Sequence, residues 1–522
     1  MKVVTTEQMR ELDRRTIADF GVPGETLMER AGSGIATVVD DLALTCGFEQ
    51  NPVRMFAGRG NNGGDVFCAA RLLSDMEYRV DVWLAGERGK VTGDALRHLE
   101  MMRLAGIDVH EATTPDDWED IMATSVCDEG VIVDGVLGTG IRGPARGAAA
   151  GAIQYINALG DTGPVVSVDV PSGLDSDMGE ALGDVVCADV TVTMGMPKKG
   201  LVMPDALEFV GNVEVVDIGI PFELTDPIMS DLDLITVDEL REVMPRRSRT
   251  SHKGTYGHLL IIGGAAGYAG AVILAARAAV RSGAGLVSVL APACIVPAVA
   301  SAIPEAMIHA GGETDSGSLS GDALSSWSRS IEEFDAIAIG PGLTTHPASR
   351  DLVCDILKNL DGPLLLDADA LNVIATDLRT VKKCRANVVV TPHPGEMGRM
   401  LGISAADVQK ARFKTAKEAA KRLGAVVVLK GAGTLVAEEG APLSVNMTGN
   451  PGLARGGMGD VLAGLLGGLL AQGMTSRDAA CMAVYLHGRA GDRVAWTSSQ
   501  AGMSAGDVVD CLPVAYSELT PR

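Results

Sequence analysis

Apolar and polar positions alternate with two different periods along the first 220 residues. Residues 5–19 and 26–45 repeat apolar side chains every three to four positions, which predicts two amphipathic helices, the first capped by Thr5 or Thr6. Short apolar runs that predict strands occupy residues 53–58 and open the segments 130–144, 165–179 and 190–201. This alternation of strands and helices predicts an α/β domain built on a parallel sheet.

The remainder of the chain shows the same alternation. A buried strand at residues 258–262 leads through a glycine loop into a strongly apolar helix, and apolar runs follow in the segments 335–344, 363–374, 388–401 and 425–436. Four of these runs end in glycine or proline turns, which is typical of a doubly wound parallel sheet with its site at the carboxyl ends of the strands. A polar, proline-bearing stretch at 221–250 separates the two halves, so we place the domains at 1–224 and 225–522.

Composition narrows the classes of partner. The chain has 522 residues, with 44 basic against 67 acidic side chains and a net charge of −23, which argues against nucleic acid or an anionic membrane as a partner. The nine cysteines form no C-x-x-C pair and predict reduced thiols. The N-terminal stretch is charged, and there is no uninterrupted apolar run of about 18 residues. We therefore expect a cytoplasmic protein.

Candidate chemistry in the second half centres on the segment 450–464, NPGLARGGMGDVLAG. Its glycine-rich turn opens an apolar helix, so free backbone N–H groups and the positive end of the helix dipole favour a phosphate there. Asp460 stands where the helical pattern begins and is placed to take a proton from an attacking hydroxyl, although a helix-capping Asp behind a flexible loop explains it equally well. No G-x-x-x-x-G-K-[ST] motif occurs, which excludes a P-loop.

Three other features of the second half have two interpretations each. The loop Lys430 to Thr434, KGAGT, suits a phosphate cradle of backbone amides and a hydroxyl. His393 lies between two prolines and is either a presented functional group or a turn residue. Asp367 and Asp369 are either metal-related or part of a helix cap.

Candidate chemistry in the first half gathers at predicted strand ends. The sequence GRGNNGGD at 58–65 fits G-x-G-x-x-G between a strand and a helix that we expect to begin at Asp65, and its dense polar insert suggests side-chain ligands, including ligands to a cation. Asp134 and Asp169 follow two further strands, and Lys198 follows another. A cap or a turn explains each of the three acids Asp65, Asp134 and Asp169 taken alone. Because all three lie at neighbouring strand ends, one shared site is favoured.

The motifs GRGNNGGD, VDGVLGTGIRG, VDVPSGLDSD and MPKKGL resemble the NAD(P)H-hydrate (NAD(P)HX) epimerases, in family order and over most of residues 1–220. The resemblance implies a Rossmann-like three-layer αβα domain that interconverts the R and S epimers of hydrated NAD(P)H and binds K⁺. It implies Asp169 and Lys198 as acid–base groups. The residues it implies for the substrate are Asn61, Asn62, Gly63, Gly64, Asp65, Gly138, Thr139, Gly140, Ile141, Arg142, Gly143, Pro144 and Asp169; those for potassium are Asn62, Asp134 and Ser172.

The motifs SHKGTYGHLLIIGG, GYAGA, GPGL, DADALN, TPHPGE, KGAGT and GGMGDVLAG resemble the ADP- or ATP-dependent NAD(P)H-hydrate dehydratases, a branch of the ribokinase-like αβα superfamily, across roughly residues 250–490. The resemblance implies Mg²⁺, an ADP or ATP co-substrate and Asp460 as the base. The residues it implies for the hydrate are Ala271, Gly342, His393 and Asp460; those for the nucleotide are Lys430, Gly431, Ala432, Gly433, Thr434 and Gly459.

Together the two resemblances predict a bifunctional repair enzyme, whose ligands are NAD(P)HX and an adenine nucleotide and which we expect to form a homo-oligomer. Physical argument does not choose between ADP and ATP. One alternative keeps Asp460 but makes the second half a small-alcohol kinase. Another makes the first half a binding or scaffold module without catalysis.

Overall fold

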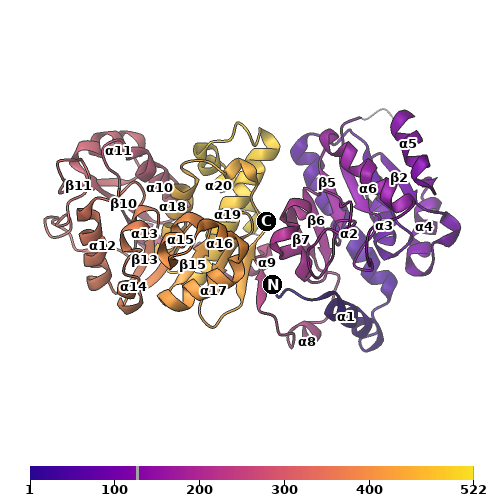
Figure 1. Cartoon of the computed structure of the whole chain (residues 1–522). Coiled ribbons are helices and arrows are strands. Elements are labelled where there is room, and N and C mark those ends of the chain that lie inside the picture. Colours follow the sequence, from indigo (N-terminus) through magenta and orange to yellow (C-terminus); the bar gives the residue numbers. More distant parts are fainter. Residues whose placement is uncertain (125–127, 521–522) are drawn as a thin grey trace. The chain divides into compact units, whose positions relative to one another are not determined.

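The chain divides into two compact units, Met1–Ser230 and Asp231–Arg522, in a computed structural model that describes residues 1–124 and 128–520 (Figure 1). Residues just after 224 belong to the N-terminal unit. Lys2 Nζ donates to the Asp226 carbonyl at 2.6 Å, and Ser230 Oγ donates to the Val3 carbonyl at 2.8 Å. The structural boundary therefore follows residue 230 rather than 224, because the N-terminal strand-like segment holds the intervening residues.

The N-terminal unit is built on a seven-stranded parallel sheet in the order β3-β2-β1-β4-β5-β6-β7. Every residue of β1, β4, β5 and β6 is buried, so helices cover both faces of the sheet. The order reverses between β1 and β4, which is where such sheets bind ligands. The strands are β1 Val53–Ala57, β2 Val80–Ala85, β3 Val109–Ala112, β4 Ile132–Gly135, β5 Val165–Val168, β6 Val190–Met194 and β7 Asn212–Val216.

The helices of this unit follow the predicted pattern with one change of boundary. Thr5 is the N-cap of α1, with a capping box to Gln8. Helix α3 begins at Asn61 instead of Asp65, because Gly60 serves as its N-cap, so the polar motif forms the first turn of the helix rather than a loop. The helices are α1 Thr6–Ala18, α2 Gly24–Cys46, α3 Asn61–Asp75, α4 Gly93–Leu104, α5 Pro115–Thr124, α6 Ala148–Leu159, α7 Leu207–Val210 and α8 Phe222–Thr225.

The C-terminal unit is built on a ten-stranded sheet in the order β11-β10-β9-β12-β13-β14-β15-β16-β17-β8. The strands from β11 to β15 run parallel, while β16 pairs antiparallel with both of its neighbours. The strands are β8 Leu232–Leu234, β9 His258–Ile262, β10 Leu286–Pro292, β11 Met307–Gly311, β12 Ala336–Ile339, β13 Pro363–Leu366, β14 Asn387–Val390, β15 Val426–Leu429, β16 Thr434–Ala437 and β17 Leu443–Asn446.

The core of this unit forms around α18, most of whose residues are buried, against β9, β12 and β13 and between α10, α19 and α20. Within the described residues no helix has the length and hydropathy needed to cross a membrane. The helices are α9 Val237–Val243, α10 Ala269–Arg281, α11 Val296–Ala302, α12 Pro347–Asn359, α13 Asp369–Ile374, α14 Arg379–Lys383, α15 Pro394–Leu401, α16 Ala405–Lys410, α17 Arg412–Leu423, α18 Met458–Ala471, α19 Ser476–Thr497 and α20 Ala505–Leu519.

Candidate active sites

Asp460 lies in the first turn of α18 and does not cap it. The helix begins at Met458, and its N-cap is Gly457, which takes the left-handed conformation at φ +91°. A side chain at this N-cap would be strained, which explains the glycine. The interpretation of Asp460 as a helix-capping residue is therefore wrong, and its carboxyl group is left beside the unpaired N–H groups of the helix start.

A partly buried lysine, Lys430, connects three acidic residues to this helix start. Lys430 Nζ donates to Asp367 Oδ1 at 2.9 Å and lies 3.9 Å from Glu396 Oε2. A Cβ atom on Gly459 would lie 3.5 Å from the same Nζ, so the lysine reaches the first turn of α18. Burial alone would lower the pKa of Lys430, but Asp367, Glu396 and Asp460 together raise it, and the ammonium group stays charged.

Burial raises the pKa of two of these carboxyl groups to near neutral pH. It raises the pKa of Asp460 to about 7, with the charge of Asp367 adding to the shift and Lys430 opposing it. Burial likewise raises the pKa of Glu396 to about 7. A carboxyl group with a pKa near the working pH is suited to accept and release a proton, which is the property expected of a general base.

A buried arginine, Arg412, stabilises the loop that carries Lys430. The Arg412 guanidinium donates to the carbonyls of Leu429, Lys430 and Gly433 at 3.2–3.3 Å. With these carbonyls held by Arg412, the loop is fixed around Gly431 and Gly433, which have φ values of +140° and +58°. Thr434 Oγ1 donates to the Gly431 carbonyl at 2.8 Å. This arrangement is compatible with a rigid backbone cradle for an anion.

Two of the three other hydrate-contact candidates lie next to each other. A Cβ atom on Gly342, whose φ is +62°, would lie 3.1 Å from the Ala271 Cβ. His393 is the N-cap of α15, where its Nδ1 accepts from the backbone N–H groups of Gly395 and Glu396. Burial and the charge of Lys430 lower the pKa of His393, so the ring is neutral with its proton on Nε2. His393 Nε2 is 3.4 Å from Glu396 Oε1, which joins it to the acidic cluster.

In the N-terminal unit the first turn of α3 lies against the loops that follow β4 and β5. Asn62 Nδ2 donates to the carbonyls of Leu137 and Val168 at 3.3 and 2.7 Å. A Cβ atom on Gly138 would lie 2.3 Å from Asn62 Oδ1, so this glycine permits the contact between the two predicted substrate segments. The rest of the 138–144 loop is partly or fully exposed.

Asp134 is buried at the end of β4 and accepts hydrogen bonds from neutral groups. Ser172 donates to it through both Oγ and its backbone N–H, at 2.6 and 2.9 Å, and Ser167 Oγ donates at 2.8 Å. Burial raises the pKa of Asp134, while these hydrogen bonds oppose the shift. Ser172 Oγ also lies 3.2 Å from the Leu137 carbonyl, the same oxygen that Asn62 contacts. The three residues predicted for potassium thus surround one group of oxygens.

Asp169 and Lys198 follow β5 and β6 and form a buried ion pair. Lys198 is 1% exposed, and its Nζ donates to Asp169 Oδ1, to Thr193 Oγ1 at 3.1 Å and to the Met194 carbonyl at 2.8 Å. Asp169 has φ +66°, a left-handed conformation that is rare for a residue other than glycine and is typical of functional positions. Burial and the charge of Asp169 raise the pKa of Asp65 well above its usual value, so Asp65 lies near the same pair. Asp65, Asp169 and Lys198 therefore share one site.

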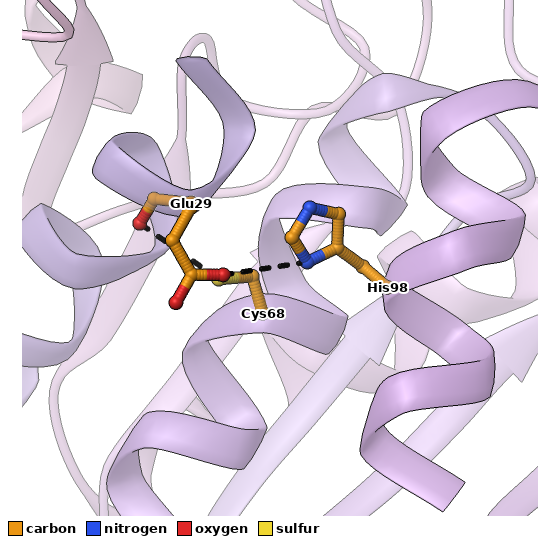
Figure 2. A group of neighbouring side chains, drawn as sticks. All are labelled: Glu29, Cys68 and His98. Atoms are coloured by element: carbon orange, nitrogen blue, oxygen red, sulfur yellow. Dashed lines mark hydrogen bonds and ion pairs between the residues drawn. The ribbon is translucent and has the colours of Figure 1, made fainter. Parts of the chain in front are cut away.

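A separate cluster of Glu29, Cys68 and His98 lies between α2, α3 and α4 (Figure 2). The ligand atoms of these residues are within 4.8 Å of one another, a spacing that a metal ion is able to bridge. Arg71, however, donates to both carboxylate oxygens of Glu29 at 2.5 and 2.7 Å. Burial raises the pKa of the Cys68 thiol, which keeps its proton and donates to Glu29. The cluster is therefore an internally neutralised polar group, and we assign it no metal.

Sequence reasoning missed several residues of both sites. Glu396 received no role of its own, although the H-x-x-E spacing resembles a capping box and marks the start of a helix. Arg412 and Thr193 reach their sites only once the chain has folded, and no sequence signal separates them from other helix and strand residues.

Of the nine cysteines, the eight in the described residues are free thiols, and Cys127 lies outside those residues.

The fold and the arrangement of charged side chains define a two-unit α/β enzyme, with buried acidic and basic groups at the strand ends of both sheets and a glycine-rich helix start in the second. Profiles of known families match both units: "NAD(P)H-hydrate dehydratase" over residues 259–514 and "YjeF-related protein N-terminus" over residues 24–200. The chain belongs to the family of bifunctional NAD(P)H-hydrate repair enzymes, as its similarity to relatives of that name shows.

Among these relatives, the bifunctional NAD(P)H-hydrate repair enzyme Nnr of Moorella thermoacetica is 39% identical over 99% of this chain and 97% of its own length. The enzyme of the same name from Escherichia coli is 36% identical over 90% of this chain and 86% of its own length. Among solved structures, the ADP/ATP-dependent NAD(P)H-hydrate dehydratase from Bacillus subtilis, co-crystallized with ATP/Mg²⁺, is 34% identical with a TM-score of 0.50. The match covers 55% of this chain and 98% of that one. The expected family, fold class and type of activity are confirmed.

Proposed function

We propose that the C-terminal unit dehydrates the S epimer of NAD(P)HX at the expense of ADP or ATP, and that the N-terminal unit interconverts the R and S epimers. The observation that carries the dehydratase assignment is the Asp460 carboxyl group, which has a pKa of about 7 beside Lys430 at the start of α18. The observation that carries the epimerase assignment is the buried pair of Asp169 and Lys198 beside Asp65.

In the dehydratase reaction Asp460 takes the proton of the substrate hydroxyl, and the oxygen attacks the terminal phosphorus of the nucleotide while the bond to the shorter nucleotide breaks. The ring nitrogen then supplies the electrons that expel phosphate with its C–O bonding pair, and loss of the neighbouring C–H proton restores the dihydropyridine. The phosphates are held by Lys430, the Gly431 to Thr434 loop and Gly459. The hydrate is contacted by Ala271, Gly342 and His393. Hydroxide is a poor leaving group and phosphate a good one, which explains the use of a nucleotide.

The residues around Lys430 fit a magnesium-bound nucleotide. Asp367 and Asp369 provide carboxylate oxygens of the kind that Mg²⁺ prefers, and the electrostatic influence of both on Asp460 supports a role for them near the proposed base. When bound, Mg²⁺ neutralises charge on the transferring phosphoryl group.

In the epimerase reaction the residues Asn61 to Asp65 and Gly138 to Pro144 hold the hydrate, and Asp169 with Lys198 transfers protons to and from its hydroxyl group. The side-chain oxygens of Asn62, Asp134 and Ser172 are hard donors of the kind that a monovalent cation prefers, and Asn62 Nδ2 donates to the carbonyls of Leu137 and Val168 in this structure. The hydrogen bonds to the buried Asp134 carboxylate come from the neutral groups of Val136, Ser167 and Ser172, so a cation there would offset its charge. Bound K⁺ would supply that offset, held by Asn62, Asp134 and Ser172.

The product of the nucleotide reaction separates this function from that of a small-alcohol kinase. The full chain is mixed with the S epimer, Mg²⁺ and either ADP or ATP, and the products are separated by chromatography. We expect free phosphate and NAD(P)H in equal amounts. A stable phosphorylated alcohol, with no return of dihydronicotinamide absorbance, would overturn the proposal in favour of the kinase.

The free thiols of the described residues are consistent with a reducing, cytoplasmic setting. We include in the proposal that the protein works there as a homo-oligomer, with small anionic ligands and neither nucleic acid nor membrane as partner.

A further inference from the structure

Asp13, on α1, carries a buried acidic oxygen that no predicted role uses. Among the described residues its Oδ1 is shielded from solvent and has no hydrogen-bond partner. An unpartnered buried carboxyl oxygen is unfavourable, so its retention calls for a functional explanation.

Hydrogen bonds connect α1 and the residues just before it to two segments of the proposed epimerase site. The backbone of Val4 pairs with the Lys198 segment, since Val4 N donates to the Pro197 carbonyl at 2.9 Å and Lys199 N donates to the Val4 carbonyl at 2.8 Å. Arg10 Nη2 donates to the Thr139 carbonyl at 2.9 Å, in the loop expected to hold substrate. Asp13 follows Arg10 by three positions and therefore lies on the same side of the helix.

Three charged groups lie close enough to Asp13 to interact with it electrostatically. Lys198 and Asp169 both act on its carboxyl group, and Asp13 in turn acts on Asp65 of α3. Burial, together with the charge of Asp169 and against that of Lys198, raises the pKa of Asp13 to about 6. Asp169 accepts hydrogen bonds from Lys198, Thr193 Oγ1 and the Met194 N–H, whereas Asp13 Oδ1 accepts no hydrogen bond among the described residues.

We propose that Asp13 is the second proton-transferring carboxyl group of the epimerase site and works opposite Asp169. This inference rests on the proposed epimerase function of the N-terminal unit. In one direction Asp13 protonates the substrate hydroxyl, the C–O bond breaks, and water leaves with the bonding pair while the ring-nitrogen lone pair forms a C=N bond. Water then adds to the opposite face of this carbon and gives a proton to Asp169. The reverse reaction exchanges the two roles, and no oxidant or reductant is needed.

The test uses the full chain without nucleotide, so that the dehydratase reaction is silent. Pure R epimer is incubated with wild type, Asp13→Asn or a control variant, Asp19→Asn, which removes an exposed carboxylate at the C-cap of the same helix. Epimers are separated by chromatography, and the spontaneous rate is subtracted. We expect Asp13→Asn to lower kcat by about 10²- to 10⁴-fold with little change in KM, and Asp19→Asn to behave as wild type.

Two further readouts distinguish proton transfer from a structural role. The wild-type rate should fall as pH rises through about 6, where Asp13 loses its proton. This falling limb of the pH–rate profile should be absent from the residual rate of Asp13→Asn. Added acetate should restore part of the rate to Asp13→Ala. An unchanged rate or an unchanged limb in Asp13→Asn would overturn this inference while leaving the epimerase function intact. A wild-type chain that does not epimerise would instead overturn the proposed function itself.

Discussion

Asp460 combines a catalytic advantage with a structural disadvantage. Its pKa of about 7 lies above the usual 3.8 because the carboxyl group is buried near Asp367. Folding therefore favours the protonated form, and the ionised group opposes folding increasingly as pH rises from about 4 to 7, with the full penalty above that range.

Replacing Asp460 by Asn should therefore raise stability at alkaline pH while removing activity. We expect the thermal midpoint of the C-terminal unit to rise by at least about 2 °C at pH 8, where the carboxylate is charged, and by less at pH 5. Scanning calorimetry at the two values measures this. A midpoint that falls at pH 8, or a gain that grows towards pH 5, would show that the carboxylate is not held in an unfavourable environment.

At the scale of elements, close packing of α18 on α10 fixes where the helix start of the site lies. A Cβ atom on Gly464 of α18 would lie 1.8 Å from the Ala275 carbonyl oxygen of α10, so the two backbones come together only because this residue is glycine. Gly468 permits the same close approach at the next turn of α18, since a Cβ atom there would lie 2.0 Å from Ser282 Oγ.

Gly464→Ala should separate these helices and destabilise the C-terminal unit by about 1–3 kcal/mol, since backbone has to move to admit the methyl group. The matched control is Gly270→Ala, in the exposed first turn of α10, where a Cβ atom meets nothing within 4 Å and helix propensity should add up to about 1 kcal/mol. Urea unfolding of both variants provides the comparison. Equal stability of the two variants would contradict the close-packing account.

Element type and order were predictable from the sequence, but the exact site was not. Apolar periodicity located central strands of both sheets, namely β1, β4, β5, β6, β9, β12, β13, β14 and β15, but not the strands at the sheet edges. Strand ends located Asp134, Asp169 and Lys198, because parallel strands end at one edge. The start of α3 was misplaced because helical backbone through Asn61 and Gly64 depends on the fit against Gly138, which no local pattern shows. Asp13 went unnoticed because it reads as an ordinary surface residue of an amphipathic helix.

At the scale of the molecule, each site is made from residues of one unit. The proposed epimerase residues all lie within Met1–Ser230, and the proposed dehydratase residues all lie within Asp231–Arg522. The solved Bacillus subtilis dehydratase, which corresponds to the second unit alone, supports the independence of that site. The loss of one acidic group should therefore stop one reaction and leave the other.

The most direct test supplies pure R epimer, Mg²⁺ and ADP or ATP to the full-length Asp460→Asn variant and measures both the epimer ratio and dihydronicotinamide absorbance over time. We predict that the variant produces the S epimer at the wild-type rate and returns no NAD(P)H above the uncatalysed background. Return of NAD(P)H at a rate close to that of wild type would contradict the assignment of Asp460 as the base, and with it the central claim.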